Sequence, residues 1–407
     1  MKKIVLISVV SMLFYSCQVS FKTFVKYLPE VTKELSYVSK EHRMNKKSET
    51  TYHYGRKSSF VLTDEGVFIP CKVNDTTCLL FYDTENNNHA FLEQISGNAE
   101  FPKTFKTVKV RTIIPNVTMK RGLDYYNIES DFFDFKQSVG RLFALSNDTV
   151  TPICLPENTN NRFSLSVNVF PKWGDIMLLN FSDTSITLLD SNSLYDTIGF
   201  TPIKAAYTCR GFFIWSTVDS IEYQFVFNTT SKEFLSIPQH QYAQHKKEDD
   251  IFIAKYRKTE YADMILDTAI CQQTNTITME DGNAIMGDVL YVKYLSKPVM
   301  GMAFISQFDW IIDPKGKVYA KKIKDKQDKD YHINPYLVNV FDTVLRITSL
   351  PVGNIEYPLF AIVDSINGEK VSTNNICQMK DLLNKRNGFK DNKILILHSA
   401  NTMFLKN

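Results

Sequence analysis

The chain has 407 residues, which is too long for one compact core, and we expect two or three structural units because domains typically have roughly 100–200 residues. A formal net charge of +3 and 22% charged residues lack the basic excess that attracts nucleic acid. The 13% aromatic content, against only 15 Gly, favours packed β-strands over a disordered chain. The composition therefore predicts a folded protein with no nucleic-acid partner.

The N-terminus is typical of an export signal. Two lysines precede an almost uninterrupted apolar run over residues 4–15, which is shorter than the roughly 20 residues that a membrane-spanning helix needs. Ser16-Cys17 follows and resembles a bacterial lipobox, which implies that Cys17 is acylated and anchors the mature protein to a membrane. The bulky Phe14 and Tyr15 leave a simple secretory peptide as the alternative. No acidic cluster follows Cys17, so we expect a bacterial envelope protein that faces the periplasm.

Six cysteines remain if Cys17 is lipidated, and an oxidising compartment permits them to pair. A two-residue turn at Asn74-Asp75 would place Cys71 opposite Cys78 across a hairpin, within reach of a disulfide. Two half-buried thiols are an equally consistent interpretation. The other cysteines lack the C-x2-C spacing of zinc sites and the seven His are scattered, so we infer no metal site and no cofactor.

One long duplication emerges when the chain is shifted by about 145 residues. The segment Val67–Glu85 aligns without a gap with Phe212–Thr230, although two apolar strands can also match by composition alone. Each copy has the pattern of a β-hairpin with a turn of small polar residues, at Asn74-Asp75 and at Asp219-Ser220. Each then ends in a polar triplet, Asp83-Thr84-Glu85 in the first copy and Asn228-Thr229-Thr230 in the second.

A second pattern is shared near the end of each copy. We align Phe181–Asp190 with Phe304–Asp313 and predict a turn followed by a strand in both. The later segment begins earlier, at Met300-Gly301, and contains Phe308-Asp309 and Ile312-Asp313. The two shared patterns together resemble pepsin-like and retropepsin-like aspartic proteases, over roughly residues 58–322. The resemblance implies a two-lobed double β-barrel with a cleft that holds an extended peptide.

The same resemblance implies a pair of catalytic aspartates, one from each lobe. Because like charges about 3 Å apart cannot both ionise, the two carboxyl groups share one proton and act as base and acid on water and the peptide carbonyl. Position by position, the chain offers Asp83-Thr84-Glu85 and Asn228-Thr229-Thr230 in place of two Asp-Thr-Gly triplets. Asn228 cannot ionise, and Glu85 and Thr230 add side chains where the family has glycine. We therefore expect ordinary dyad catalysis to be lost.

Two interpretations of the first triplet remain open. Asp83 with Glu85 could form an unconventional acid pair, but residues two apart in a loop rarely converge on one water. Alternatively, Asp83 and Thr84 form a retained structural loop in which both side chains hydrogen-bond backbone amides.

The tail has a different pattern after the charged run that ends at Asp330. It reads as a strand from Val344, a strand–turn–strand over Ala361–Val371, a short helix over Met379–Arg386 and a strand from Lys393. The run from Asp364 to Val371 resembles the core motif of PDZ domains. Leu350–Gly353 is the nearest candidate for the carboxylate-binding loop of that family, and a unit that only packs on the body is as consistent as one that binds peptides.

The sequence thus predicts a mainly β protein: a two-lobed aspartic-protease-like double β-barrel followed by a small PDZ-like α+β domain. The leading hypothesis is an envelope lipoprotein that has lost catalysis and binds a peptide or protein segment between its lobes. An active, unconventional aspartic endopeptidase that uses Asp83 and a purely structural envelope protein are the alternatives. The expected divisions are a signal segment at 1–17, an arm at 18–57, lobes at 58–195 and 196–322, a linker at 323–335 and the PDZ-like domain at 336–407.

Overall fold

The computed structural model forms two units, residues 1–49 and 50–407, which are described separately. In the first unit, residues 39–44 form a short helix. Strand β1 (Glu49–Tyr52) begins at Glu49, the last residue of this unit. Everything below concerns the second unit. The structure describes residues 39–44, 46–63, 66–74, 76–84, 91–94, 106–109, 118–145, 154, 166–167, 175–208, 211–244, 246–258, 264–279, 284–293, 295–313, 315, 317–323, 332–341, 344–354, 356–385 and 387–397.

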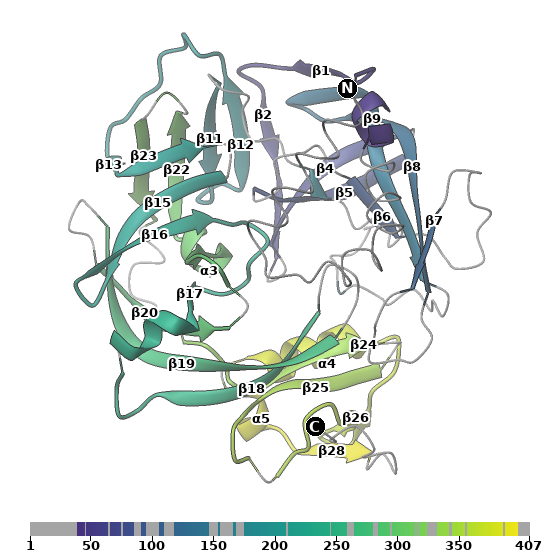
Figure 1. The fold of residues 1–407 in the computed structure, drawn as a ribbon, viewed down its shortest axis with the longest axis vertical. Helices are drawn as coiled ribbons and strands as arrows, with labels where there is room; N and C mark the ends of the chain where they lie inside the picture. Colours follow the sequence, from purple (N-terminus) through teal and green to yellow (C-terminus); the bar gives the residue numbers. More distant parts are fainter. Residues whose placement is uncertain are drawn as a thin grey trace, which may run out of the picture. The chain divides into compact units, whose positions relative to one another are not determined.

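Strands dominate the described residues, which confirms the predicted mainly β class (Figure 1). The predicted signal segment with Cys17, and Glu85 of the first triplet, lie outside the described residues. Within the part of the chain that the structure describes, no helix is both long and apolar enough to cross a membrane.

Both predicted hairpins are present. The first is formed by β4 (Gly66–Val73) and β5 (Thr76–Tyr82), and the second by β15 (Gly211–Val218) and β16 (Ile221–Phe227). In the second turn Asp219 and Ser220 have φ of 45° and 75°, the left-handed values that a two-residue turn of type I′ requires. In β16 alternate aromatic side chains, Tyr223, Phe225 and Phe227, are buried, as one face of a packed strand demands.

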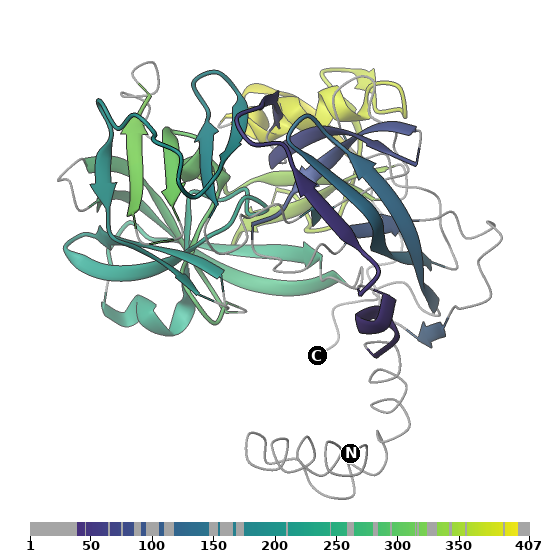
Figure 2. The same ribbon diagram turned by 90° about the horizontal axis from the view of Figure 1, so that it is seen from above.

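The order of strand pairing around each hairpin is the same. The strand before each hairpin pairs with the first strand of the hairpin. A short strand pairs in parallel with the last two residues of the second strand of the hairpin. Two long antiparallel strands follow in the pairing order, and each of them pairs with a further strand. Figure 2 shows the long pair of the first set, β8 and β9, as adjacent twisted strands. The first set is β3 (Val61–Thr63), β10 (Ser166–Val167), β8 (Thr118–Glu129), β9 (Phe133–Leu145), β7 (Lys106–Lys109) and β6 (Phe91–Gln94). The second set, in the same order, is β14 (Ala205–Thr208), β21 (Val299–Met300), β19 (Met264–Thr278), β20 (Ala284–Val292), β18 (Ile251–Lys258) and β17 (Leu235–Pro238), and η1 (Gln239–Gln244) follows β17.

The closing segments of the two copies meet in one six-stranded sheet. Its order is β13 (Thr201–Ile203), β23 (Lys317–Lys322), β22 (Phe308–Asp313), β11 (Ile176–Asn180), β12 (Ser185–Leu189) and β2 (Lys57–Ser59). β11 and β22 pair at the centre, with Met177 opposite Ile312. The strand that occupies the position equivalent to β22 is therefore β11. Our alignment of Phe181–Asp190 with Phe304–Asp313 matches β12 to β22 and is therefore wrong by one strand. The reason is that β11 and β12 are both short and apolar, so composition alone does not distinguish them.

One large hydrophobic core joins the residues of both hairpins and of the six-stranded sheet. Trp310 on β22 is fully buried, with its ring centroid 5.3 Å from that of Phe227 and its Nε1 donating to the carbonyl of Ile305, 2.8 Å away. Ile305 ends the short helix α3 (Met302–Ile305), which follows Gly301. A Cβ at Gly301 would lie 2.2 Å from the carbonyl oxygen of Glu233, so the motif requires glycine there.

The tail has its own hydrophobic core, to which β25, α4 and α5 contribute. The predicted Asn367-Gly368 turn is present, with φ of 53° and 84°. Its elements are β24 (Leu337–Phe341), β25 (Val344–Pro351), β26 (Ile362–Ile366), β27 (Glu369–Lys370), α4 (Ile376–Asn384), α5 (Gly388–Asp391) and β28 (Ile394–Leu397). β25 also pairs with β18, which makes the second set and the tail one thirteen-stranded sheet.

The cysteines form a different disulfide from the one considered above. Cys71 and Cys78 are opposite each other in the β4–β5 register, as predicted, but neither forms a disulfide and both are buried. The sequence left a disulfide or two thiols open for this pair, and the structure has two thiols. Cys154 and Cys377 are bonded instead, over a sequence separation of 223 residues that no local pattern could reveal.

We expect the thiols of Cys71 and Cys271 to resist alkylation in the native protein. Burial raises the pKa of both thiols above the usual value, and nearby Cys78 and Asp131 raise that of Cys71 further. Because only the thiolate is nucleophilic, neither residue should react with iodoacetamide at pH 8. Mass spectrometry after labelling, with and without denaturant, tests this expectation. Labelling of either residue in the native protein as fast as in denaturant would contradict it.

Candidate functional site

The two polar triplets lie at the ends of equivalent strands. Asp83 directly follows the last residue of β5, and Asn228 directly follows the last residue of β16. The strands that flank them in parallel, β10 and β21, pair with the final two residues of each. The fold thus delivers both triplets to one place from positions 145 residues apart.

The threonines of the two triplets hydrogen-bond each other reciprocally. The Thr84 amide donates to Thr229 Oγ1 at 3.1 Å, and the Thr229 amide donates to Thr84 Oγ1 at 3.0 Å. Thr84 Oγ1 donates to the carbonyl of Phe227 at 2.9 Å, and Thr229 Oγ1 donates to the carbonyl of Tyr82. Each hydroxyl therefore accepts a hydrogen bond from the amide of the other threonine. It also donates to the carbonyl that lies two residues before that other threonine in the sequence. Thr84 is 2% exposed and Thr229 is 0% exposed, so water cannot replace these partners.

Asn228 is held by donors from its own loop. Its side-chain Oδ1 accepts from the Thr230 amide at 2.7 Å, from Thr230 Oγ1 at 2.7 Å and from the Ser231 amide at 3.2 Å. The backbone amide of Asn228 donates to the carbonyl of Met300 at 3.0 Å. Three donors that converge on one oxygen would suit a carboxylate as well as an amide. The loop thus has the hydrogen-bonding surroundings of an acid around a residue that cannot ionise.

Asp83 is the one carboxylate among the described residues of the two triplets, and it is half-buried. Tyr82, the residue before Asp83, is fully buried, and its hydroxyl donates to Met177 Sδ at 3.1 Å. Burial raises the pKa of the Tyr82 hydroxyl well above the usual value. The described residues of the two triplets contain one ionisable group, Asp83. A single carboxylate and a neutral amide cannot provide both an acid and a base.

Two glycines fix the backbone around the site. At Gly301 a Cβ would meet the Ser231 carbonyl oxygen at 2.7 Å, and the next amide, of Met302, donates to that same oxygen at 2.7 Å. Gly66, at φ 138°, has no room either, since a Cβ would lie 2.5 Å from the ring of Phe81 and 3.0 Å from the Thr229 carbonyl oxygen. The absence of a side chain at Gly301 therefore lets its backbone lie close to Ser231, which follows the second triplet. The absence of a side chain at Gly66 lets its backbone lie close to Thr229 of that triplet.

The structure brings together Asp83, Thr84, Asn228, Thr229 and Thr230 of the predicted site residues. Of the two interpretations of the first triplet, it confirms for Thr84 that the side chain binds a backbone amide. The sequence did not predict the Tyr82 and Phe227 carbonyls as hydrogen-bond acceptors, because residue types do not show which partners backbone groups have. A search against models of known protein families and a search of curated proteins both found no match for this chain.

Proposed function

We propose that this chain is an exported, lipid-anchored envelope protein with a two-lobed aspartic-protease-like fold that has lost catalysis and binds an extended peptide or protein segment between its lobes. The reciprocal hydrogen bonds of Thr84 and Thr229 carry this proposal. They join two loops that are equivalent in sequence and in strand pairing, which is the relation expected of two lobes that share one site. The repeated pairing order and the central six-stranded sheet support the same architecture.

Loss of catalysis follows from the chemistry of Asn228. Its amide oxygen takes the three donors that would orient a carboxylate, and an amide has no proton to share at any relevant pH. Binding does not need the dyad, because an extended peptide is held largely by main-chain hydrogen bonds. Asp83 keeps an acceptor at the site.

For the tail we propose a PDZ-like unit that packs on the body instead of capturing peptide termini. Leu350 and Pro351 of its candidate carboxylate loop pair with Ala254 and Ile253 of β18. The amide of the next residue, Val352, donates to the carbonyl of Phe252 at 2.7 Å. These backbone groups are already used, which argues against terminal-carboxylate binding there.

The proposal is tested with a peptide that can report both binding and cleavage. Fluorescently labelled, reduced and alkylated insulin B chain should bind by anisotropy and stay intact at pH 3–7. Asp83→Arg places a large cation at the site and should weaken binding at least roughly tenfold, the effect of losing one charge-assisted hydrogen bond. Asp249→Arg makes the same charge change at an exposed position and is the matched control.

Three outcomes separate the alternatives. Cleavage that disappears in Asp83→Ala would identify an active endopeptidase and refute the loss of catalysis. No binding, with both arginine variants folded, would favour the purely structural protein. Equal weakening by Asp83→Arg and Asp249→Arg would place the peptide elsewhere and refute the proposed site.

A further inference from the structure

The tail and the body each have a hydrophobic core of their own. Here the body means residues 50–323 and the tail means residues 332–397. The large core contains body residues only, and a second core contains tail residues only. A small third cluster includes Ile333, at the start of the tail, with residues of β18, β19 and β20. Because each core is complete in itself, the contacts between body and tail decide whether they move together.

Besides this third cluster, the described residues of body and tail share two small non-covalent contacts. The β18–β25 ladder comprises three residue pairs, Ile253–Lys255 with Ser349–Pro351. Beside it, the fully buried Asp288 of β20 accepts the Ile333 amide at 2.8 Å through Oδ2, and its Oδ1 lies 3.3 Å from His332 Nδ1. One contact is made by β25 and the other by the residues before β24.

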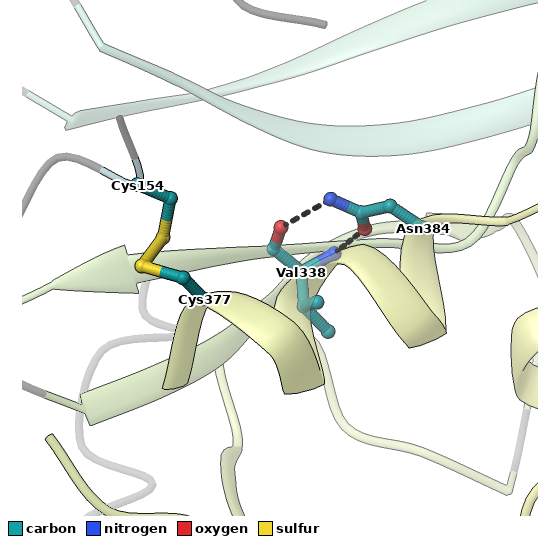
Figure 3. The surroundings of a disulfide bond; sticks show 4 residues. All are labelled: Cys154, Val338, Cys377 and Asn384. Atoms are coloured by element: carbon teal, nitrogen blue, oxygen red, sulfur yellow. Dashed lines mark hydrogen bonds between the residues drawn. A yellow bond between two sulfur atoms is a disulfide. The ribbon is translucent and has the colours of Figure 1, made fainter. Parts of the chain in front are cut away.

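A covalent contact is made by the disulfide between Cys154 and Cys377, with the two Cα atoms 5.1 Å apart (Figure 3). Cys154 belongs to the connection between β9 and β10 of the body, and Cys377 lies in the first turn of α4. The other end of α4 is fixed within the tail, because Asn384 accepts the Val338 amide at 2.9 Å and donates to the Val338 carbonyl at 3.1 Å. A bond to Cys377 therefore holds the whole tail and not the helix alone.

We propose that Cys154–Cys377 is a redox-controlled crosslink that decides whether the tail is fixed on the body. A dithiol reductant breaks the S–S bond and transfers two electrons and two protons, which yields the thiols of Cys154 and Cys377 and the cyclic disulfide of the reductant. The ladder, the third cluster with Ile333 and the Asp288 contacts then remain as the attachment, and the tail pivots at β25. The oxidised form is the fixed form, which rests on the proposed export to a compartment that permits disulfides.

The first experiment cuts the connector between the two parts. Residues 324–330 of the full chain are replaced by the recognition sequence of a site-specific protease, and the purified oxidised protein is cleaved. The part after the cut contains a single cysteine, Cys377, so a tail that stays on the body in a non-reducing denaturing gel must be bonded through it. We expect the tail to stay attached in wild type and in the control C71S, which changes a buried cysteine of the body core, and to be lost in C154S.

The second step measures the tail under native conditions. Loss of the crosslink turns an intramolecular contact into an intermolecular one, so we expect dithiothreitol to increase the fraction of free tail in gel filtration at micromolar protein by roughly tenfold or more. A tail that still elutes entirely with the body after complete reduction would overturn the proposal. A crosslink that persists in C154S would also overturn it, because Cys377 would then have another partner.

Hydrogen exchange of the uncut chain provides a second measurement if the cleaved protein is unstable. In C154S, amides of the β18–β25 ladder, such as those of Leu350 and Val352, should exchange faster than in the control C71S, while amides in the tail core at Ile362–Ile366 should be unchanged. Faster exchange in the tail core as well would show an unfolded tail and refute a pivot. Unchanged exchange at the ladder would refute the crosslink as the controlling contact.

Discussion

Substitution of Asn228 by Asp is expected to create acid-dependent proteolysis in a protein for which we propose a loss of catalysis. The carboxylate would take the donors that now bind Asn228 Oδ1, from Thr230 and from the Ser231 amide, so the loop should accept it without rearrangement. The reciprocal threonine bonds already join its loop to that of Asp83. Two carboxyl groups in that arrangement can share a proton and supply the base and the acid.

The expected gain is roughly 100-fold or more over wild type in cleavage of insulin B chain, the lower range for positioned acid–base groups. The pH dependence has a definite sign. The dyad needs one proton, so activity should be present in acid and lost as the pH rises above about 5, where both groups ionise. Glu85 and Thr230 stand where the aspartic-protease motif has glycine, so a variant that also contains Glu85→Gly and Thr230→Gly should cleave faster than N228D alone.

The control for this prediction is D83N/N228D, which has one acid again but on the other loop. It should be as inactive as wild type. Thermal unfolding of each variant establishes that it is folded. Equal cleavage by N228D and D83N/N228D would show that the activity does not come from a pair, and the equivalence of Asp83 and Asn228 would then be wrong.

Substitution of Thr229 by Val is expected to lower the free energy of unfolding by about 3 kcal/mol. Valine has nearly the shape of threonine, so packing is retained while the hydroxyl is lost. The Thr84 amide loses its acceptor and the Tyr82 carbonyl loses its donor, in a place where Thr229 is 0% exposed and Thr84 is 2% exposed. Buried polar groups without partners cost about 1–3 kcal/mol each. T84V should have a similar effect, because the bonds of the two hydroxyls are reciprocal.

A double-mutant cycle measures whether the two threonines act as a unit. The loss in T84V/T229V should be smaller than the sum of the single losses by about 1–2 kcal/mol, since residues in one hydrogen-bond network are not additive. Urea unfolding followed by tryptophan fluorescence provides the free energies. T373V, at an exposed position, should change stability by less than about 0.5 kcal/mol. A T229V effect as small as that of T373V would show that the bonds between the loops contribute nothing.

Local features of the fold followed from the sequence because their causes are local. The aromatic and β-branched residues of β16 and the small polar turn at Asp219-Ser220 specify a hairpin wherever it is placed. The same holds for the Asn367-Gly368 turn of the tail. The alignment of the closing strands failed because β11 and β12 are both short and apolar. Only their pairing in the six-stranded sheet distinguishes them.

The sequence by itself determined which residues stand at the ends of the two equivalent strands, and therefore that one of the two is Asn228 and not an acid. It also determined that Cys71 and Cys78 are opposite each other, because a two-residue turn fixes the register. Only the tertiary structure decided which hydrogen-bond and disulfide partners the residues of the site and the cysteines have. The bonds between Thr84 and Thr229 and the disulfide between Cys154 and Cys377 join segments 145 and 223 residues apart. Such contacts depend on how whole sheets pack, and no local pattern of residue types encodes them.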